Sequence, residues 1–217
     1  MSLLAATLLA SAPATRAEAA DATSVADQID ANWIVQNIAQ PVQTGTPFVE
    51  VRSSPLLKSP LRISGEYRRP DADTLVREVR SPYAETTTLA QGKVSIAREG
   101  RRARTFSLSR APELASLQQV FGSLLAGDAA TVEQHYRLEP SGTRDGWSLL
   151  MTPKEPALAK RLRSITLHGQ GAELRCIETE SANGKELQRT LLAGAAVDAT
   201  GEQTEQALVA MCSGAAY

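Results

Sequence analysis

The amino-acid sequence contains little of what catalytic, metal-binding and nucleic-acid-binding proteins require. Its 217 residues include 2 histidines and 2 cysteines, with no paired metal-ligand spacing, and no glycine-rich phosphate loop follows a predicted strand. Aromatic residues make up 4%, which argues against stacking platforms for bases or sugars. The formal net charge of -1 gives no basic surface for nucleic acid. We therefore expect no metal, no cofactor and no nucleic-acid partner.

No constellation for hydrolysis is visible either. A hydrolase needs a nucleophile, a base and an orienting group, and the chain has no G-x-S-x-G elbow. The two histidines are His135, beside the end of a predicted helix, and His168, at the end of a predicted strand. These positions favour surface or edge roles, so the sequence predicts a protein that is not an enzyme. An esterase would need one of these histidines close to a serine and a carboxylate.

The N-terminal segment lacks a hydrophobic run long enough for a membrane anchor. Its apolar run, Leu3 to Ala12, is much shorter than the roughly 20 residues that span a bilayer. Ala17-Glu18-Ala19 offers an A-x-A cleavage pattern, although no basic residue precedes Arg16. We predict a signal peptide over 1–20, with a disordered alanine-rich tail as the alternative.

Export would place Cys176 and Cys212 in an oxidising compartment. A disulfide between them would tie the C-terminal tail to a predicted strand. The sequence does not give the Cα separation that decides whether the two cysteines can pair. The sequence is therefore compatible with a disulfide and equally with two unpaired thiols.

The hydrophobic pattern is helical at first and strand-like from about residue 48. Val25, Ile29 and Trp33 recur at four-residue spacing and predict an amphipathic helix over 24–39. After Phe48 the period is close to two, with short segments separated by glycine turns. These segments indicate antiparallel meanders rather than βαβ units. The first two predicted strands begin at about Phe48 and Leu61. The others are 74–80, 85–89, 93–98, 104–109, 136–140, 146–151, 164–168, 173–180 and 186–192.

A helical pattern interrupts the strands between residues 112 and 134. Pro112 suits a first helical position, Gly127 a C-terminal cap, and Asp128 the N-cap of a second short helix. The first helix has an apolar stripe that either packs into an ordinary core or covers a cavity. The stripe consists of Leu114, Leu117, Phe121, Leu124 and Leu125. The predicted fold class is α+β, a large curled antiparallel sheet with helices laid across its concave face.

Several sequence elements recur in an order known from one protein family. They are F-x-E-x-R from Phe48, G-E-Y closing in R-R-P at Pro70, a P-x-L-x-x-L helix ending in L-L-A-G-D at Asp128, W-S-L-L-M-T-P from Trp147, and I-T-L-H-G. Over about residues 24 to 193, the chain resembles the LolA family of periplasmic lipoprotein carriers.

This resemblance implies an open, incomplete antiparallel β-barrel with helices as a lid over an apolar cavity. We expect a carrier domain over 21–197 and a C-terminal tail over 198–217. In the family an arginine just before the proline of the early strand helps to hold the lid closed. Arg69 matches it by its place in R-R-P, with an exposed strand-end charge as the alternative, and we expect Trp33 as a second lid contact.

The resemblance also implies a function. We expect a monomeric carrier in the periplasm of a Gram-negative bacterium that shields the acyl chains of a lipoprotein or other lipid during transfer toward the outer membrane. Its partners would be this cargo, an inner-membrane donor and an outer-membrane acceptor. The alternative is a non-catalytic structural or assembly factor that docks a partner through a sheet edge, which needs a filled core. The expected cavity residues are Leu117, Phe121, Leu124, Trp147, Leu149 and Met151.

Overall fold

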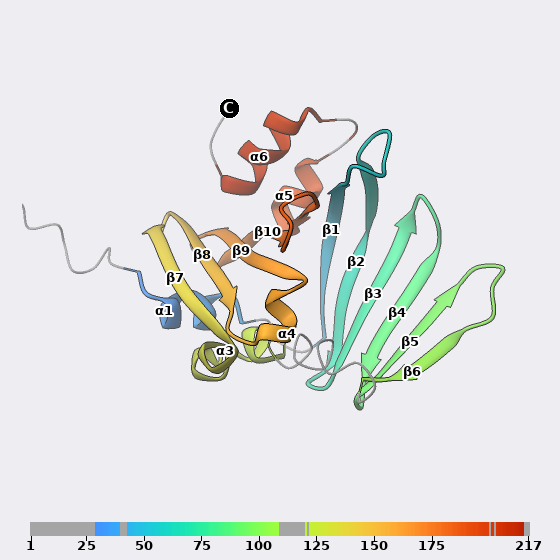
Figure 1. The fold of residues 1–217 in the computed structure, drawn as a ribbon, viewed down its shortest axis with the longest axis horizontal. Coiled ribbons are helices and arrows are strands. Elements are labelled where there is room, and N and C mark those ends of the chain that lie inside the picture. Colours follow the sequence, from blue (N-terminus) through green and yellow to red (C-terminus); the bar gives the residue numbers. More distant parts are fainter. Residues whose placement is uncertain are drawn as a thin grey trace, which may run out of the picture.

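A single antiparallel sheet forms the framework of the protein. The computed structural model describes residues 29–39, 43–108, 120, 122–199, 201 and 203–214, so the predicted signal peptide lies outside the described residues. The sheet has 11 strands in the order β6-β5-β4-β3-β2-β1-β11-β10-β9-β8-β7 (Figure 1). The strands are β1 (Thr44–Ser53), β2 (Leu61–Asp71), β3 (Thr74–Ser81), β4 (Glu85–Ala90), β5 (Lys93–Arg98), β6 (Arg104–Ser107), β7 (Tyr136–Thr143), β8 (Gly146–Pro153), β9 (Leu162–Gln170), β10 (Glu173–Ser181) and β11 (Leu187–Leu192).

Two meanders make up this sheet, β1 to β6 and β7 to β11, and each strand pairs with its neighbour in the chain. The meanders are joined where β1 pairs with β11, with Phe48 opposite Leu192. Within the described residues no pairing joins β6 to β7, so the sheet does not close. A hairpin turn at Asn183-Gly184 lies between β10 and β11, and Gly184 has the positive φ of 68° that favours glycine in a turn. The predicted α+β fold with an open antiparallel sheet is confirmed.

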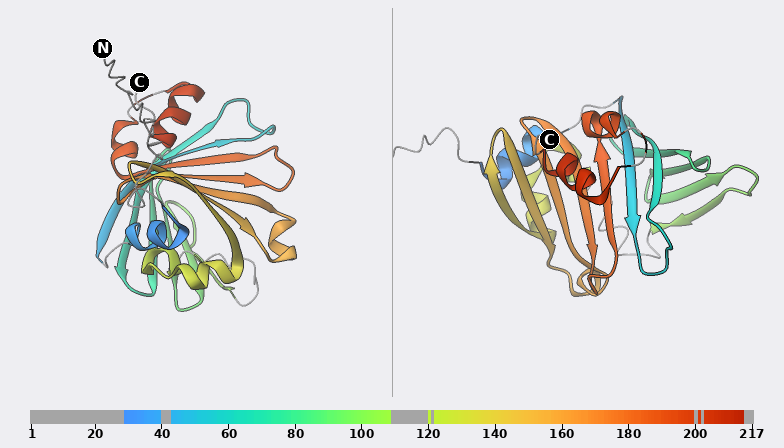
Figure 2. Two further views of the ribbon diagram at one scale, coloured as in Figure 1. Left: turned by 90° about the vertical axis from the view of Figure 1, so that its left-hand side faces the viewer. Right: turned by 90° about the horizontal axis from the view of Figure 1, so that it is seen from above.

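The helices lie on both sides of the curled sheet. Figure 2 shows α1 (Ala31–Asn37) and α3 (Ala129–His135) inside the curve, while α5 (Ala193–Asp198) and α6 (Glu205–Ser213) lie outside it. A short helix, α4 (Pro156–Ala159), connects β8 to β9. None of the helices in the described ranges has the length and apolarity needed to cross a bilayer.

Side-chain caps begin both inner helices. The Asp30 carboxylate accepts a hydrogen bond from the Trp33 backbone N–H at 2.6 Å, and Asp128 accepts one from Thr131 at 3.0 Å. Such caps satisfy backbone donors that have no partner within the helix. The predicted N-cap at Asp128 is therefore confirmed.

One end of the concave face is filled by a dense core. Alternate residues of β8 are buried, because successive side chains of a strand point to opposite faces of the sheet. Trp147, Leu149 and Met151 therefore share the face that packs beneath α1 and α3. Ile34 of α1 and Val132 of α3 have no exposed surface there. The inward side chains of β8 are therefore part of a packed core.

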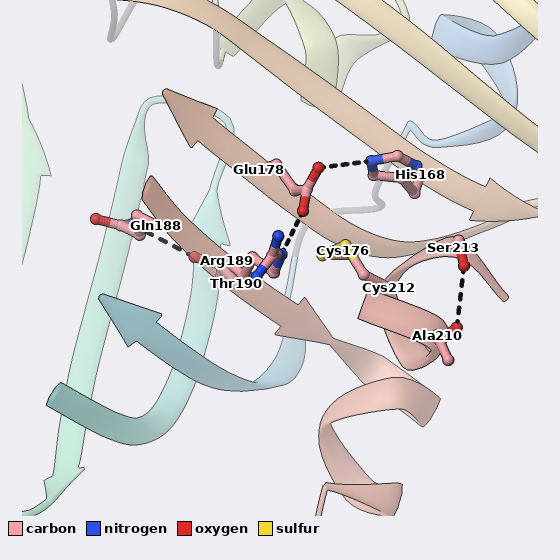
Figure 3. The surroundings of a disulfide bond; sticks show 9 residues. All are labelled: His168, Cys176, Glu178, Gln188, Arg189, Thr190, Ala210, Cys212 and Ser213. Carbon is pink, nitrogen blue, oxygen red and sulfur yellow. Dashed lines mark hydrogen bonds and ion pairs between the residues drawn. A yellow bond between two sulfur atoms is a disulfide. The ribbon is translucent and has the colours of Figure 1, made fainter. Parts of the chain in front are cut away.

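The outer face of the sheet carries a second core beneath α5 and α6. Val49 and Leu191, neighbours across β1 and β11, pack there with Leu208 of α6. Cys176 of β10 and Cys212 of α6 form a disulfide, with their Cα atoms 5.0 Å apart (Figure 3). The pairing that the sequence left open is thus present, and it ties the segment expected as a tail to the middle of the sheet.

A half-buried carboxylate lies on the same outer face. Glu178 Oε2 is 3.3 Å from His168 Nε2, and Glu178 Oε1 accepts a hydrogen bond from Arg189 Nε (Figure 3). The hydrogen bond with His168 and the Arg189 guanidinium together lower the pKa of Glu178 to about 2, although partial burial acts in the opposite direction. Glu178 is therefore ionised in the folded protein down to acid pH.

We predict that the disulfide stabilises the fold substantially. It closes a loop with a sequence separation of 36. A loop of this length corresponds to about 4 kcal/mol of unfolding free energy in the chain-entropy model. Replacing both Cys176 and Cys212 by alanine should lower the free energy of unfolding in urea by that order. As the control, a reductant should lower the stability of the wild type and leave the double variant unchanged; an insensitive wild type would contradict the prediction.

The low pKa of Glu178 predicts an acid-dependent contribution to stability. Because the folded pKa is depressed, this stabilisation is complete above the ordinary value near 4.5 and disappears as the pH falls toward 2. Glu178→Gln should lower the free energy of unfolding by about 2 kcal/mol at pH 7, because the substitution removes charge-assisted hydrogen bonds. The difference in melting temperature between wild type and variant should shrink between pH 5 and pH 2. Parallel melting curves over that range would refute the assignment.

Candidate functional site

A large cavity occupies the part of the concave face that α1 and α3 do not cover. Its volume is about 1020 Å³, and it lies between the sheet and the helical residues 122–126. Strands β1 to β6 form one side and β9 to β11 the other. Most of the walls are apolar, with side chains that include Leu75, Leu89, Val94, Leu124, Leu174 and Leu192.

Strand register explains why one wall of the cavity is continuous. Leu75 is opposite Leu89, Leu89 is opposite Val94, and Val94 is opposite Phe106. These four residues therefore form one row across β3 to β6, and all four line the cavity. Cross-strand neighbours on one face lie about 5 Å apart, so the row leaves no polar gap.

Leu167 of β9 marks the border between the filled and the hollow parts of the concave face. It belongs to the core beneath α1 and α3 and also lines the cavity. Ile38, at the end of α1, lines the cavity too and is 3% exposed. The cavity therefore begins where the cover provided by the two inner helices ends.

Residues 122–126 close the cavity on the side away from the sheet. Leu124 and Leu125 line it, and Leu124 is 6% exposed. Arg69 of β2 donates a hydrogen bond from Nη1 to the carbonyl oxygen of Leu125, at 3.0 Å. Arg69 Nη2 is 3.4 Å from the carbonyl oxygen of Ala72. A guanidinium thus connects the rim of the sheet to the helix.

The structure brings only some of the expected site residues together. Leu124 and Arg69 lie at the cavity, whereas Leu117 and Phe121 lie outside the described residues. The residues that line the cavity in the described part of the chain do not include those expected on β8. Trp147, Leu149 and Met151 are instead buried on the same face beneath the inner helices.

Trp33, the second expected lid contact, is half-buried on α1 and packs against the filled core. The Arg144 guanidinium lies 5.4 Å from the centre of its ring. The described residues that line the cavity do not include Trp33. Its role as a lid contact stays a prediction.

The sequence reasoning missed the cavity residues on β3 to β6. Their alternating pattern predicted strands correctly, but it did not indicate which face of the sheet would be concave. The row formed by Leu75, Leu89, Val94 and Phe106 depends on pairing between strands, which no local pattern reveals.

One end of the cavity is polar. Thr179, Gln188, Thr190 and Tyr67 line it there. Burial raises the pKa of the Tyr67 hydroxyl, which is therefore protonated near neutral pH. Glu50 is buried on the same face, 1% exposed, and forms ion pairs with two arginines.

The described residues contain one cluster with the composition of a metal site. Ligand atoms of His168, Glu178 and Cys212 lie within 4.8 Å of one another on the outer face. The Cys212 sulfur is bonded to Cys176 and so offers no thiolate. The absence of a metal site and of catalytic residues stays a prediction.

Comparison with known proteins identifies the family. Residues 6–215 match the family model described as "Outer membrane lipoprotein carrier protein LolA-like". No curated protein matches the chain.

Solved structures show only distant similarity. A LolA superfamily protein from Nitrosomonas europaea, NE2245, is 11% identical over 76% of this chain and 92% of its own, with a TM-score of 0.39. The MucA/MucB complex of Pseudomonas aeruginosa contains a chain 15% identical over 83% of this chain, with a TM-score of 0.40. The match covers 60% of that chain, which is less than two thirds of its length. These TM-scores are below 0.5 and add nothing to the family match.

The family match extends over nearly the whole chain and agrees with the sequence elements around Phe48 to Pro70 and Trp147 to Pro153. The chain therefore belongs to the LolA-like family of outer membrane lipoprotein carrier proteins.

Proposed function

We propose that this protein is a non-catalytic carrier that shields the acyl chains of a lipoprotein or another lipid during transfer toward the outer membrane. The observation that carries the proposal is the apolar cavity of about 1020 Å³ on the concave face. Pockets for small ligands typically measure roughly 300–1,000 Å³ and are lined mainly by apolar side chains. A cavity at the upper end of this range has room for a flexible hydrocarbon chain.

The walls supply affinity without recognising a particular chain. Each methylene that leaves water contributes about 0.8 kcal/mol, so a chain of ordinary length binds strongly through burial alone. Release then requires a change in the protein, either movement of residues 122–126 or handover to a partner that binds the cargo better. The contact between Arg69 and Leu125 is the connection that such a movement would break.

The same proposal includes location and partners. Membership of a family named for outer membrane lipoprotein carriers supports a periplasmic protein that takes cargo from an inner-membrane donor and delivers it to an outer-membrane acceptor. The expected export signal and the disulfide agree with an oxidising compartment. The alternative, an assembly factor that docks a partner through a sheet edge, needs a filled core. The cavity favours the carrier.

The proposal predicts that a charge on the cavity wall weakens binding, whereas the same charge on the other face does not. Leu75 of β3 lines the cavity, and the next residue, Val76, points to the opposite face of the same strand. Leu75→Glu should weaken binding of a neutral fluorescent acyl ester at least about tenfold, because an apolar contact worth about 1.5–3 kcal/mol is lost. Val76→Glu should bind as the wild type does.

Fluorescence titration measures both affinities, and thermal melting of both variants checks that they are folded. If the two substitutions weaken binding equally, the cavity is not the binding site. If wild-type protein takes up no acyl ester, the carrier function itself is contradicted.

The hydrogen bond from Arg69 predicts control of cargo release. Arg69→Lys keeps the charge but loses the planar donor group that reaches the Leu125 carbonyl oxygen. We expect the acyl ester to dissociate about tenfold faster, because a charge-assisted hydrogen bond is worth about 1.5 kcal/mol. Stopped-flow displacement measures the rate. Arg68→Lys, on the outer face of the same strand, is the matched control, and equal rates in both variants would exclude this role for Arg69.

A further inference from the structure

A contiguous polar patch interrupts the apolar concave face at one end of the cavity. Glu50 and Arg52 of β1 are opposite Thr190 and Gln188 of β11, and Gln188 is in turn opposite Thr179 of β10. Residues 50 and 52 of β1, 188 and 190 of β11, and 179 of β10 therefore lie on one face in adjacent positions. These five residues are the polar patch.

Apolar residues on the neighbouring strands flank the polar patch on the same face. Glu50 is opposite Ile63 of β2. Thr190 is opposite Ile177 of β10, and Thr179 is opposite Ile165 of β9. Thr190 is 4% exposed. A polar island within an apolar surface differs from the alternating solvated face that most antiparallel strands present.

The five residues of the polar patch carry no net charge, but Arg77 of β3, on the same face, adds a positive charge beside them. Glu50 Oε1 accepts a hydrogen bond from Arg52 Nε at 2.6 Å, and Glu50 Oε2 accepts one from Arg77 Nη2 at 3.1 Å. Two guanidinium groups thus share one carboxylate, which leaves an excess of one positive charge. A buried ion pair contributes little net stability and commonly costs it, so packing alone does not explain the cluster.

Three residues of the polar patch border the cavity. Thr179, Gln188 and Thr190 line it, and Arg52, whose side chain is 47% exposed, is opposite Gln188 on the neighbouring strand. Gln188 Nε2 is 3.4 Å from Thr190 Oγ1 (Figure 3), a weak hydrogen bond that a ligand oxygen can replace. Neutral donors beside an excess positive charge are the complement of an oxyanion.

We propose that the polar patch binds the oxyanion head group of an amphiphile whose acyl chain occupies the cavity. This inference rests on the proposed function and specifies its cargo: a long-chain lipid that ends in a carboxylate or a phosphate, in preference to a neutral ester. The chain lies along the apolar walls that include Leu75 and Leu89, and the head group lies between Gln188 and Arg52.

Competition between matched amphiphiles tests the proposal on the full chain. A neutral fluorescent acyl ester is displaced with dodecanoate, with dodecyl phosphate and with methyl dodecanoate, all below their aggregation limits. At least one of the two anions should compete at a concentration about tenfold lower than the methyl ester, and the stronger of the two identifies the head-group class.

Substitutions then locate the head-group site. Arg52→Met should bring the ratio of anion affinity to ester affinity close to one, and Gln188→Leu should lower it severalfold. Arg68→Met is the matched control: Arg68 also pairs with a glutamate, and its side chain is 50% exposed, but it lies on the outer face of β2. It should keep the wild-type ratio. Melting curves check the folding of each variant.

The outcomes separate this proposal from the carrier function. Equal competition by all three amphiphiles in the wild type would overturn the head-group site and leave the carrier standing. Displacement by none of them would contradict the carrier function itself. A wild-type preference for anions that survives both Arg52→Met and Gln188→Leu would exclude the polar patch. If Arg52→Met does not fold, Gln188→Leu decides alone, since it removes no charge.

Discussion

The pairing of β1 with β11 is the interaction on which the rest of the structure depends. Each meander can form from neighbouring hairpins, but only this ladder joins the two into one curved surface. Its register also determines which side chains face the concave side of the sheet and which face the outer core. Phe48 and Leu192 pack on the concave side, and Val49 and Leu191 lie in the outer core. A shift of this register by one residue would move each set to the opposite face and disrupt the packing on both faces.

The hollow exists because the inner helices are too short to cover the concave face. Helices α1 and α3 fill the end formed by β7 to β9 and reach as far as Leu167. Beyond it the apolar row on β3 to β6 has residues 122–126 opposite it, and a volume remains between them. The two ends use the same kind of side chain, so the difference between core and cavity arises from the reach of the helices and not from composition.

Much of this fold was predictable from the sequence, but less of the site. The period-two pattern predicted most strands, because alternation is a local property. Helix α5 was missed because Ala193–Asp198 is too short and too rich in alanine to show a stripe. Leu124 and Arg69, which lie at the cavity, were expected from a helical stripe and a family position. The pairing of β1 with β11, the disulfide and the concave face depend on contacts between distant segments, which no local pattern shows.

The open edges of the sheet have a mechanical consequence. In a closed barrel the number of strands and their stagger fix the diameter, so the interior has one size. In the described part of this chain no ladder joins β6 to β7, so this constraint does not apply to the sheet. Barrel closure therefore does not fix the size of the interior, and for the carrier proposed above this means room for chains of different length.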